Sequence, residues 1–120
     1  MLFHYQIRGY YLYSSPTDMR KGPDSLAGIV SNEFKKSPMQ GDLFIFINRR
    51  RCQIKMLHWQ GDGFAVFYKR LEKGTFELPQ KEGQEIASAL SSEQVLFLLQ
   101  GIALKSIVKR PRYSQQFVDK

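Results

Sequence analysis

Apolar and polar positions in the middle of the chain follow the pattern of three consecutive β-strands. Asp42–Ile47 is a short apolar run, Cys52–Gln60 alternates, and Phe64–Arg70 is rich in aromatic and β-branched residues. Two turns separate these runs. Asn48–Arg51 is polar, and Gly61–Gly63 contains the residue types that tolerate the positive φ of tight hairpin loops. The sequence therefore predicts an antiparallel three-strand meander at the centre of the fold.

The alternation of side chains along a strand divides this meander into two faces. A two- or four-residue first turn pairs Ile45 with Ile54, and a two-residue second turn keeps Met56 on the same face as Phe67. The face that we expect to form the core carries Leu43, Ile45, Ile47, Cys52, Ile54, Met56, Ala65 and Phe67. The opposite face is both aromatic and basic, and it carries Phe44, Phe46, Gln53, Lys55, Leu57, Trp59, Phe64, Val66, Tyr68 and Arg70.

The segments on either side of the meander predict two helices and further strands. Tyr10–Ser14 and Thr75–Leu78 are expected to be short strands. Pro23 suits the first position of a helix, and the apolar stripe that follows it predicts a helix that Ser37-Pro38 ends. We expect this first helix to cover the apolar core face of the meander. Its stripe comprises Leu26, Ile29, Val30 and Phe34.

A clear start signal marks the second helix. Ser91 can cap it, Gln94 completes a capping box, and Leu90 can pack against Val95. Gly101 is a plausible terminator of this helix. Together these elements predict an α+β fold: a largely antiparallel sheet of four or five strands, one helix packed on a face, and a C-terminal helix. A single domain is expected over residues 1–104, followed by a basic, poorly ordered tail over residues 105–120.

Composition narrows the class of protein. The 120 residues carry a net charge of +7, which favours polyanionic partners. A single cysteine excludes an internal disulfide, and no apolar run exceeds five residues, so a cytoplasmic protein without a membrane span is expected. His4, His58 and Cys52 do not form a metal-binding pattern, and no cofactor motif is present. We therefore expect no metal, no cofactor and no enzyme activity.

The clearest candidate site is the arginine run Arg49-Arg50-Arg51 on the first turn. Guanidinium groups bind phosphates bidentately, and aromatic side chains among basic ones suit nucleic-acid binding. The neighbouring candidates are Lys55, Trp59, Tyr68, Lys69 and Arg70. The alternative is that the arginines form a solvated turn, that Lys69-Arg70 is a solvated strand end, and that Trp59 belongs to the core.

A second candidate lies before the first helix. Arg20 and Lys21 could hold a phosphate near the start of that helix. Asp18 is expected to act as a structural anchor, because its carboxylate can accept hydrogen bonds from backbone N–H groups one or two residues ahead. The alternative for Arg20 is an ion pair with an acidic residue of the sheet.

Three segments carry a family resemblance: YLYSSPTDMRKGPDSLAGIV, NRRRCQIKMLHWQGDGFAVFYKRLEKGTFELP and LSSEQVLFLLQGI, which together span roughly residues 10–102. They resemble the small TnpB accessory proteins of the insertion-sequence family numbered sixty-six. The resemblance implies a role in transposition beside a separate, larger transposase. We predict a non-catalytic accessory protein that binds DNA through its phosphate backbone. The alternatives are an adaptor that docks the transposase through the aromatic face and, less favoured, a small metal-dependent nuclease.

Overall fold

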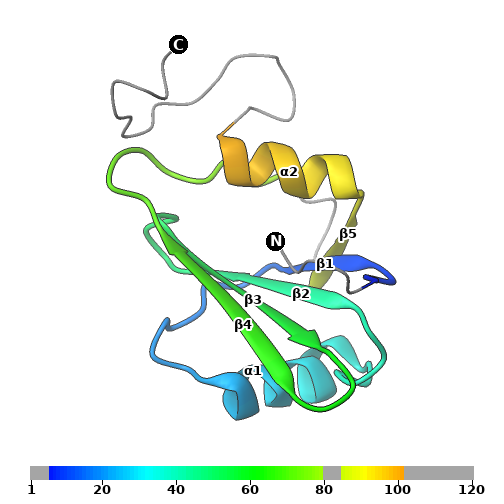
Figure 1. Ribbon diagram of the computed structural model, residues 1–120. Coiled ribbons are helices and arrows are strands. Elements are labelled where there is room, and N and C mark those ends of the chain that lie inside the picture. The colour runs from blue at the N-terminus through cyan, green and yellow to red at the C-terminus, as the bar shows by residue number, and fades with distance from the viewer. Residues whose placement is uncertain (1–5, 80–84, 102–120) are drawn as a thin grey trace.

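The structure, a computed structural model that describes residues 6–79 and 85–101, confirms the α+β fold (Figure 1). Five strands form one sheet in this part of the chain, with helices on both of its sides. The elements in chain order are β1 (Tyr10–Tyr13), α1 (Pro23–Ile29), the π-helical η1 (Val30–Phe34), β2 (Leu43–Ile47), β3 (Gln53–Trp59), β4 (Phe64–Arg70), β5 (Ala87–Leu90) and α2 (Ser92–Gln100).

The strand order is β4-β3-β2-β1-β5, and β2, β3 and β4 form the predicted antiparallel meander. β1 pairs parallel to β2 and antiparallel to β5. The strand predicted at Thr75–Leu78 is wrong, because this segment crosses the end of the sheet as a loop. Phe76 is fully buried there, and its N–H donates to the Arg51 carbonyl at 2.7 Å. The edge strand β5 was missed, since its sequence Ala-Ser-Ala-Leu lacks the β-branched and aromatic residues that favour strands.

The predicted faces are confirmed, although the register of the first hairpin differs. Ile45 lies opposite Met56 rather than Ile54, because the hairpin closes at Asn48 and not at Ile47. The Asn48 N–H donates to the Gln53 carbonyl at 3.1 Å, which leaves four residues in the turn. This register is two residues away from the predicted one, so the residues of the strands stay on their predicted faces. Cys52, which was predicted on the core face, lies instead in the turn before β3 and lines a surface groove. In the second hairpin Met56 lies opposite Phe67, so the two share a face as predicted.

Both faces of the sheet are buried, each beneath a different helix. β2 contributes to both, and its five residues are all buried. The cluster on the α2 side is mainly aliphatic and contains Leu12, Leu43, Ile45, Ile47, Ile54, Met56, Phe76, Leu90, Val95 and Leu98. The cluster on the α1 side contains Leu26, Val30, Phe44, Phe46 and Leu57, with Tyr11, Tyr13, Phe34 and Phe64 packed against it.

The prediction that the first helix covers the Ile45 face is therefore wrong. Because β1 and β2 are parallel neighbours, the chain between them must cross one face of the sheet, and α1 crosses the face of Phe44 and Phe46 (Figure 1). Both faces are apolar, so hydrophobicity alone could not assign a helix to each.

The helix ends follow the sequence signals closely for α2. Ser91 Oγ accepts the Gln94 N–H at 3.1 Å, and Gln94 Oε1 accepts the Ser91 N–H at 2.8 Å. Gly101 ends the helix with φ of 80°. α1 begins at Pro23 as predicted, and it continues into η1, which ends at Lys35 with φ of 57°. The predicted tail and the boundary at residue 104 lie outside the described residues. No helix in the described ranges is long and apolar enough to cross a membrane.

Candidate nucleic-acid interface

The turn that carries the arginines is built around the side chain of Asn48. Its Oδ1 accepts the N–H groups of Cys52 and Gln53, both at 2.9 Å, and its Nδ2 donates to the Gln53 side chain at 2.9 Å. The Arg51 N–H donates to the Asn48 carbonyl at 3.0 Å, and Arg51 takes a left-handed backbone with φ of 60°. Asn48 thus satisfies the turn internally, so the arginine side chains are not needed to hold it.

All three arginine side chains of this turn are exposed. Within residues 6–79 and 85–101, no hydrogen bond or ion pair holds any of their guanidinium groups. Their charge is therefore available to a partner.

The loop before α1 lies directly beside this turn. The Thr17 N–H donates to the Ile47 carbonyl at 2.9 Å, and Lys55 Nζ donates to the Lys21 carbonyl at 2.9 Å. These two bonds tie the loop to the end of the sheet. Between loop and turn lies a groove of about 690 Å³, which we call the arginine groove, and its lining comprises Pro16, Thr17, Asp18, Met19, Asn48, Arg49, Arg50, Cys52, Gln53 and Arg70.

Asp18 and Arg20 form a local clasp in this loop. Asp18 Oδ1 accepts the Arg20 N–H at 2.8 Å, and its Oδ2 lies 2.6 Å from Arg20 Nη2. These hydrogen bonds from the Arg20 side chain and backbone hold the pKa of the Asp18 carboxyl well below its usual range. Arg20 therefore pairs with its own loop and not with an acid of the sheet.

Polar side chains of β3 and β4 continue the groove along the α1 face. Gln53 lies opposite Arg70, and Lys55 lies opposite Tyr68. Gln53 Nε2 donates to the Tyr68 hydroxyl at 2.6 Å, and Lys55 Nζ lies 5.8 Å from the centre of the Tyr68 ring. Arg70 also pairs with Glu72 at 3.3 Å on the surface. Four of the predicted site residues (Arg49, Arg50, Lys55 and Arg70) thus gather at one end of the sheet, with Tyr68 beside them.

Three further predicted site residues, Trp59, Lys69 and Arg51, do not line the arginine groove. Trp59 stands six residues from Gln53 along β3, which corresponds to about 20 Å, and its half-buried ring packs edge-on against Phe64 at 4.9 Å. Lys69 lies on the α2 face, where its Nζ donates to the Leu99 carbonyl at 3.2 Å. Arg51 lines a separate pocket with Leu78 and Ser88.

The aromatic face predicted as a contact surface is not continuous. Phe44, Phe46 and Leu57 are fully buried beneath α1, and Tyr68 is the large aromatic side chain of that face that remains well exposed among the described residues. The arginine groove therefore forms around the rim of the α1 side.

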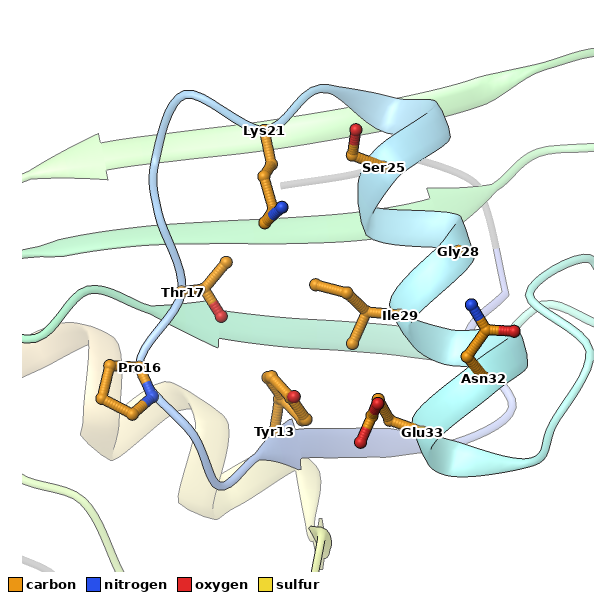
Figure 2. Close-up of a pocket in the computed structure, with 9 residues that line it drawn as sticks. All are labelled: Tyr13, Pro16, Thr17, Lys21, Ser25, Gly28, Ile29, Asn32 and Glu33. Carbon is orange, nitrogen blue, oxygen red and sulfur yellow. The ribbon is translucent and has the colours of Figure 1, made fainter.

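Two features of the site had not been assigned from the sequence. Asn48 was expected only as part of a polar turn, although asparagine favours such positions because its side chain bonds the following backbone. Lys21 lies in a second pocket of about 420 Å³, together with Tyr13, Asn32 and Glu33, which were not candidates (Figure 2). This pocket joins segments that are distant in sequence, so no local pattern marks it.

No group of three or more His, Cys, Asp or Glu side chains in the described ranges could hold a metal ion. His58, one of the histidines considered for such a role, lies inside β3 and is almost fully buried.

The chain is similar to known proteins over most of its length. Residues 8–109 match the family described as IS66 Orf2 like protein. The uncharacterized protein y4hO of Sinorhizobium fredii (strain NBRC 101917 / NGR234) is 39% identical over 92 residues, which cover 77% of this chain and 78% of that protein. The uncharacterized protein y4jC of the same strain is 29% identical over 99 residues, which cover 82% of each chain. No solved structure matches the chain significantly. The chain therefore belongs to the IS66 Orf2-like family of transposition accessory proteins.

Proposed function

We propose that this accessory protein binds DNA without sequence preference, through phosphates that lie in the arginine groove. The observation that carries the proposal is the position of Arg49 and Arg50. Both are exposed, both line the groove, and neither is paired with another side chain in the described part of the chain.

The turn suits this task because its shape does not depend on the arginines. Asn48 fixes the backbone, so little order has to be gained when the guanidinium groups meet phosphates. Arg70 lines the same groove, and its partner Glu72 is an exposed residue whose ion pair a phosphate can replace at little cost. The net charge of +7 adds a long-range attraction for DNA.

The main alternative is an adaptor that docks the transposase through the aromatic face. The rings of Phe44 and Phe46 lie beneath α1, so that face offers no continuous aromatic docking surface. DNA is therefore the partner that we favour. A complex with the transposase through another surface is compatible with this proposal.

Titration of a fluorescein-labelled blunt DNA duplex at several salt concentrations tests the proposal. Counterion release predicts weak binding, with a dissociation constant of about 10⁻⁶–10⁻⁴ M at physiological salt, that weakens steeply as salt rises. The double variant Arg49→Ala/Arg50→Ala should bind more weakly, and the slope of log K against log[salt] should decrease by about 2 if each arginine neutralises one phosphate.

The matched control is Arg8→Ala/Lys35→Ala, which removes the same charge from exposed positions away from the groove. Arg8 lies against Gly41, before the start of β2, whereas the arginine turn follows its end. This control should keep most of the salt slope. A parent protein that binds no DNA at low salt contradicts the proposal, as does a control that loses as much as the groove variant.

A further inference from the structure

A second pocket adjoins the arginine groove, and three of its polar side chains have no partner in the described part of the chain. It lies between α1, η1 and the loop over residues 16–21 (Figure 2). Its volume of about 420 Å³ falls within the range of about 300–1,000 Å³ that small-molecule sites occupy. The side chains of Lys21, Asn32 and Glu33 make no hydrogen bond or ion pair within the described ranges, although all three line this pocket.

The pocket carries a positive charge at one end and a negative charge at the other. Figure 2 shows Lys21 and Ser25 at one end, Asn32, Glu33 and Tyr13 at the other, and the apolar side chain of Ile29 between them. A ligand that fits carries an anionic group at the Lys21 end and hydrogen-bond donors at the Glu33 end. It also has a flat or apolar part that can lie against Ile29 and, near Glu33, against Tyr13. A nucleotide whose base bears an amino group has these three parts.

Gly28 lines this pocket without a side chain. It lies within α1, where glycine is a weaker helix former than alanine. A Cβ atom built at Gly28 meets nothing within 4 Å, so close packing does not require the missing side chain. Asn32 and Glu33 then follow in η1, and π-helical turns of this kind frequently occur at functional sites.

The pocket and the arginine groove meet at Pro16 and Thr17, which line both. We propose that the pocket receives one unpaired base of a DNA strand whose phosphates lie in the arginine groove. The inference rests on the proposed function, because the groove must first hold the backbone. The base stacks on Tyr13, Glu33 accepts from its amino group, and Lys21 contacts its phosphate. Transposition exposes unpaired nucleotides wherever strands are opened or cut, and this pocket would let the protein prefer such positions over intact duplex.

The test compares two labelled duplexes that differ by a single base. One contains a bulged cytosine, and the other contains the same bulge with an abasic site, so the phosphates and the bend of the backbone are matched. The unmodified protein should bind the cytosine probe about 5- to 150-fold more tightly, which corresponds to the 1–3 kcal/mol found for stacking of one base. A bulged thymine lacks an amino group, so its affinity should exceed that of the abasic probe by a smaller factor.

Gly28→Leu is the variant that fills the pocket, and Gly28→Ala is its matched control. Both should fold, because the site is open and both residues favour a helix more than glycine does. Gly28→Leu should reduce the cytosine-to-abasic ratio towards one while binding the abasic probe as well as the parent does. Gly28→Ala should retain most of the ratio. Glu33→Gln, a second variant that keeps the size of the side chain, should narrow the difference between bulged cytosine and bulged thymine.

The possible failures are distinct. Equal, salt-dependent binding of both probes by the parent overturns the base pocket and leaves the arginine groove in place. A Gly28→Leu protein with the full cytosine preference overturns it as well. Absence of binding to either probe at low salt removes the proposed function and this inference together.

Discussion

The two sides of the sheet solve the same packing problem with different residues. On the α2 side the core is mainly aliphatic, and Leu98 of the helix belongs to the same buried cluster as Ile45 and Met56 of the sheet. On the α1 side the core consists largely of rings. Phe34 lies 5.3 Å from Phe44 and 5.6 Å from Tyr13, measured between ring centres. β2 contributes side chains to both cores, because leucine or isoleucine alternates with phenylalanine along it.

The helices differ as much as the cores. α2 has a complete capping box and ends at a glycine in the left-handed conformation, which are regular and favourable ends. α1 has no side-chain cap, contains Gly28, and runs into a π-helical segment that ends at a left-handed lysine. The arginine groove and the pocket at Gly28 both lie on the α1 side. Both of the proposed binding surfaces therefore lie beside the helix with the less regular ends and geometry.

The largest effect is expected in the ring cluster. Phe46→Ala removes a fully buried ring that contacts Tyr13 and Phe34, so the free energy of unfolding should fall by about 3–5 kcal/mol. Chemical denaturation measures it. Phe46→Leu, which retains most of the apolar volume, should lose less. A Phe46→Ala protein as stable as the parent would show that α1 is not docked on this face.

A comparable loss of stability is expected when an aliphatic side chain is truncated on the α2 side. Leu98→Ala should reduce the free energy of unfolding by about 2–5 kcal/mol, because Leu98 is almost completely buried between α2 and the sheet. Leu96 lies two residues away on the same helix and is 50% exposed, so Leu96→Ala is the matched control and should change stability little. Equal losses from the two variants in denaturation experiments would contradict the docking of α2 through Leu98.

A smaller effect tests the start of α2. Ser91→Ala leaves the Gln94 N–H without its acceptor and should cost about 1 kcal/mol. Ser92, the next residue, lies inside the helix and is exposed, so Ser92→Ala serves as the control and should change stability much less. Urea denaturation of both variants measures the two changes in the free energy of unfolding. Equal stabilities of the two variants would mean that the capping box contributes nothing measurable.

The sequence predicted most clearly what depends on local chemistry. The meander, its two faces and the ends of α2 follow from alternation, turn residues and capping, each of which acts within a few positions. The exact closure of the first hairpin was missed, because the Asn48 side chain moves the turn by one residue. β5 was missed because pairing with β1, and not its own composition, makes it a strand.

The candidate site was harder to predict because it depends on contacts between distant segments. The arginine turn could be recognised from the sequence. The loop that lies beside it could not, because the hydrogen bond from Thr17 to Ile47 joins positions thirty residues apart. Trp59 and Tyr68 were grouped by face alone, yet they lie towards different ends of that face. Alternation gives the side of a sheet on which a residue lies, but it does not say what covers that side.

The smallest expected effect concerns the segments that precede the two helices. The stability that each segment contributes should depend on pH for α1 but not for α2. The clasp before α1 is charged, because Asp18 accepts from the Arg20 guanidinium and its pKa is lowered in the folded protein. A carboxyl whose pKa is lower in the folded than in the unfolded state contributes stability above its unfolded pKa of about 3.9, and this contribution disappears as the pH falls through the folded value. The capping box before α2 is uncharged and has no such dependence over this range.

Asp18→Asn keeps one oxygen that can accept the Arg20 N–H, and it removes the charge together with the second acceptor of the Arg20 guanidinium. At pH 7 we expect a loss of stability smaller than that of Ser91→Ala, because the ion pair is largely exposed. The difference between Asp18→Asn and the parent should shrink from pH 5 towards pH 2.5, whereas the difference between Ser91→Ala and the parent should stay constant. Urea denaturation of the three proteins at each pH measures both differences. A constant difference for Asp18→Asn would mean that its charge does not stabilise the loop, which would then be held by the hydrogen bonds of Thr17 and Lys55.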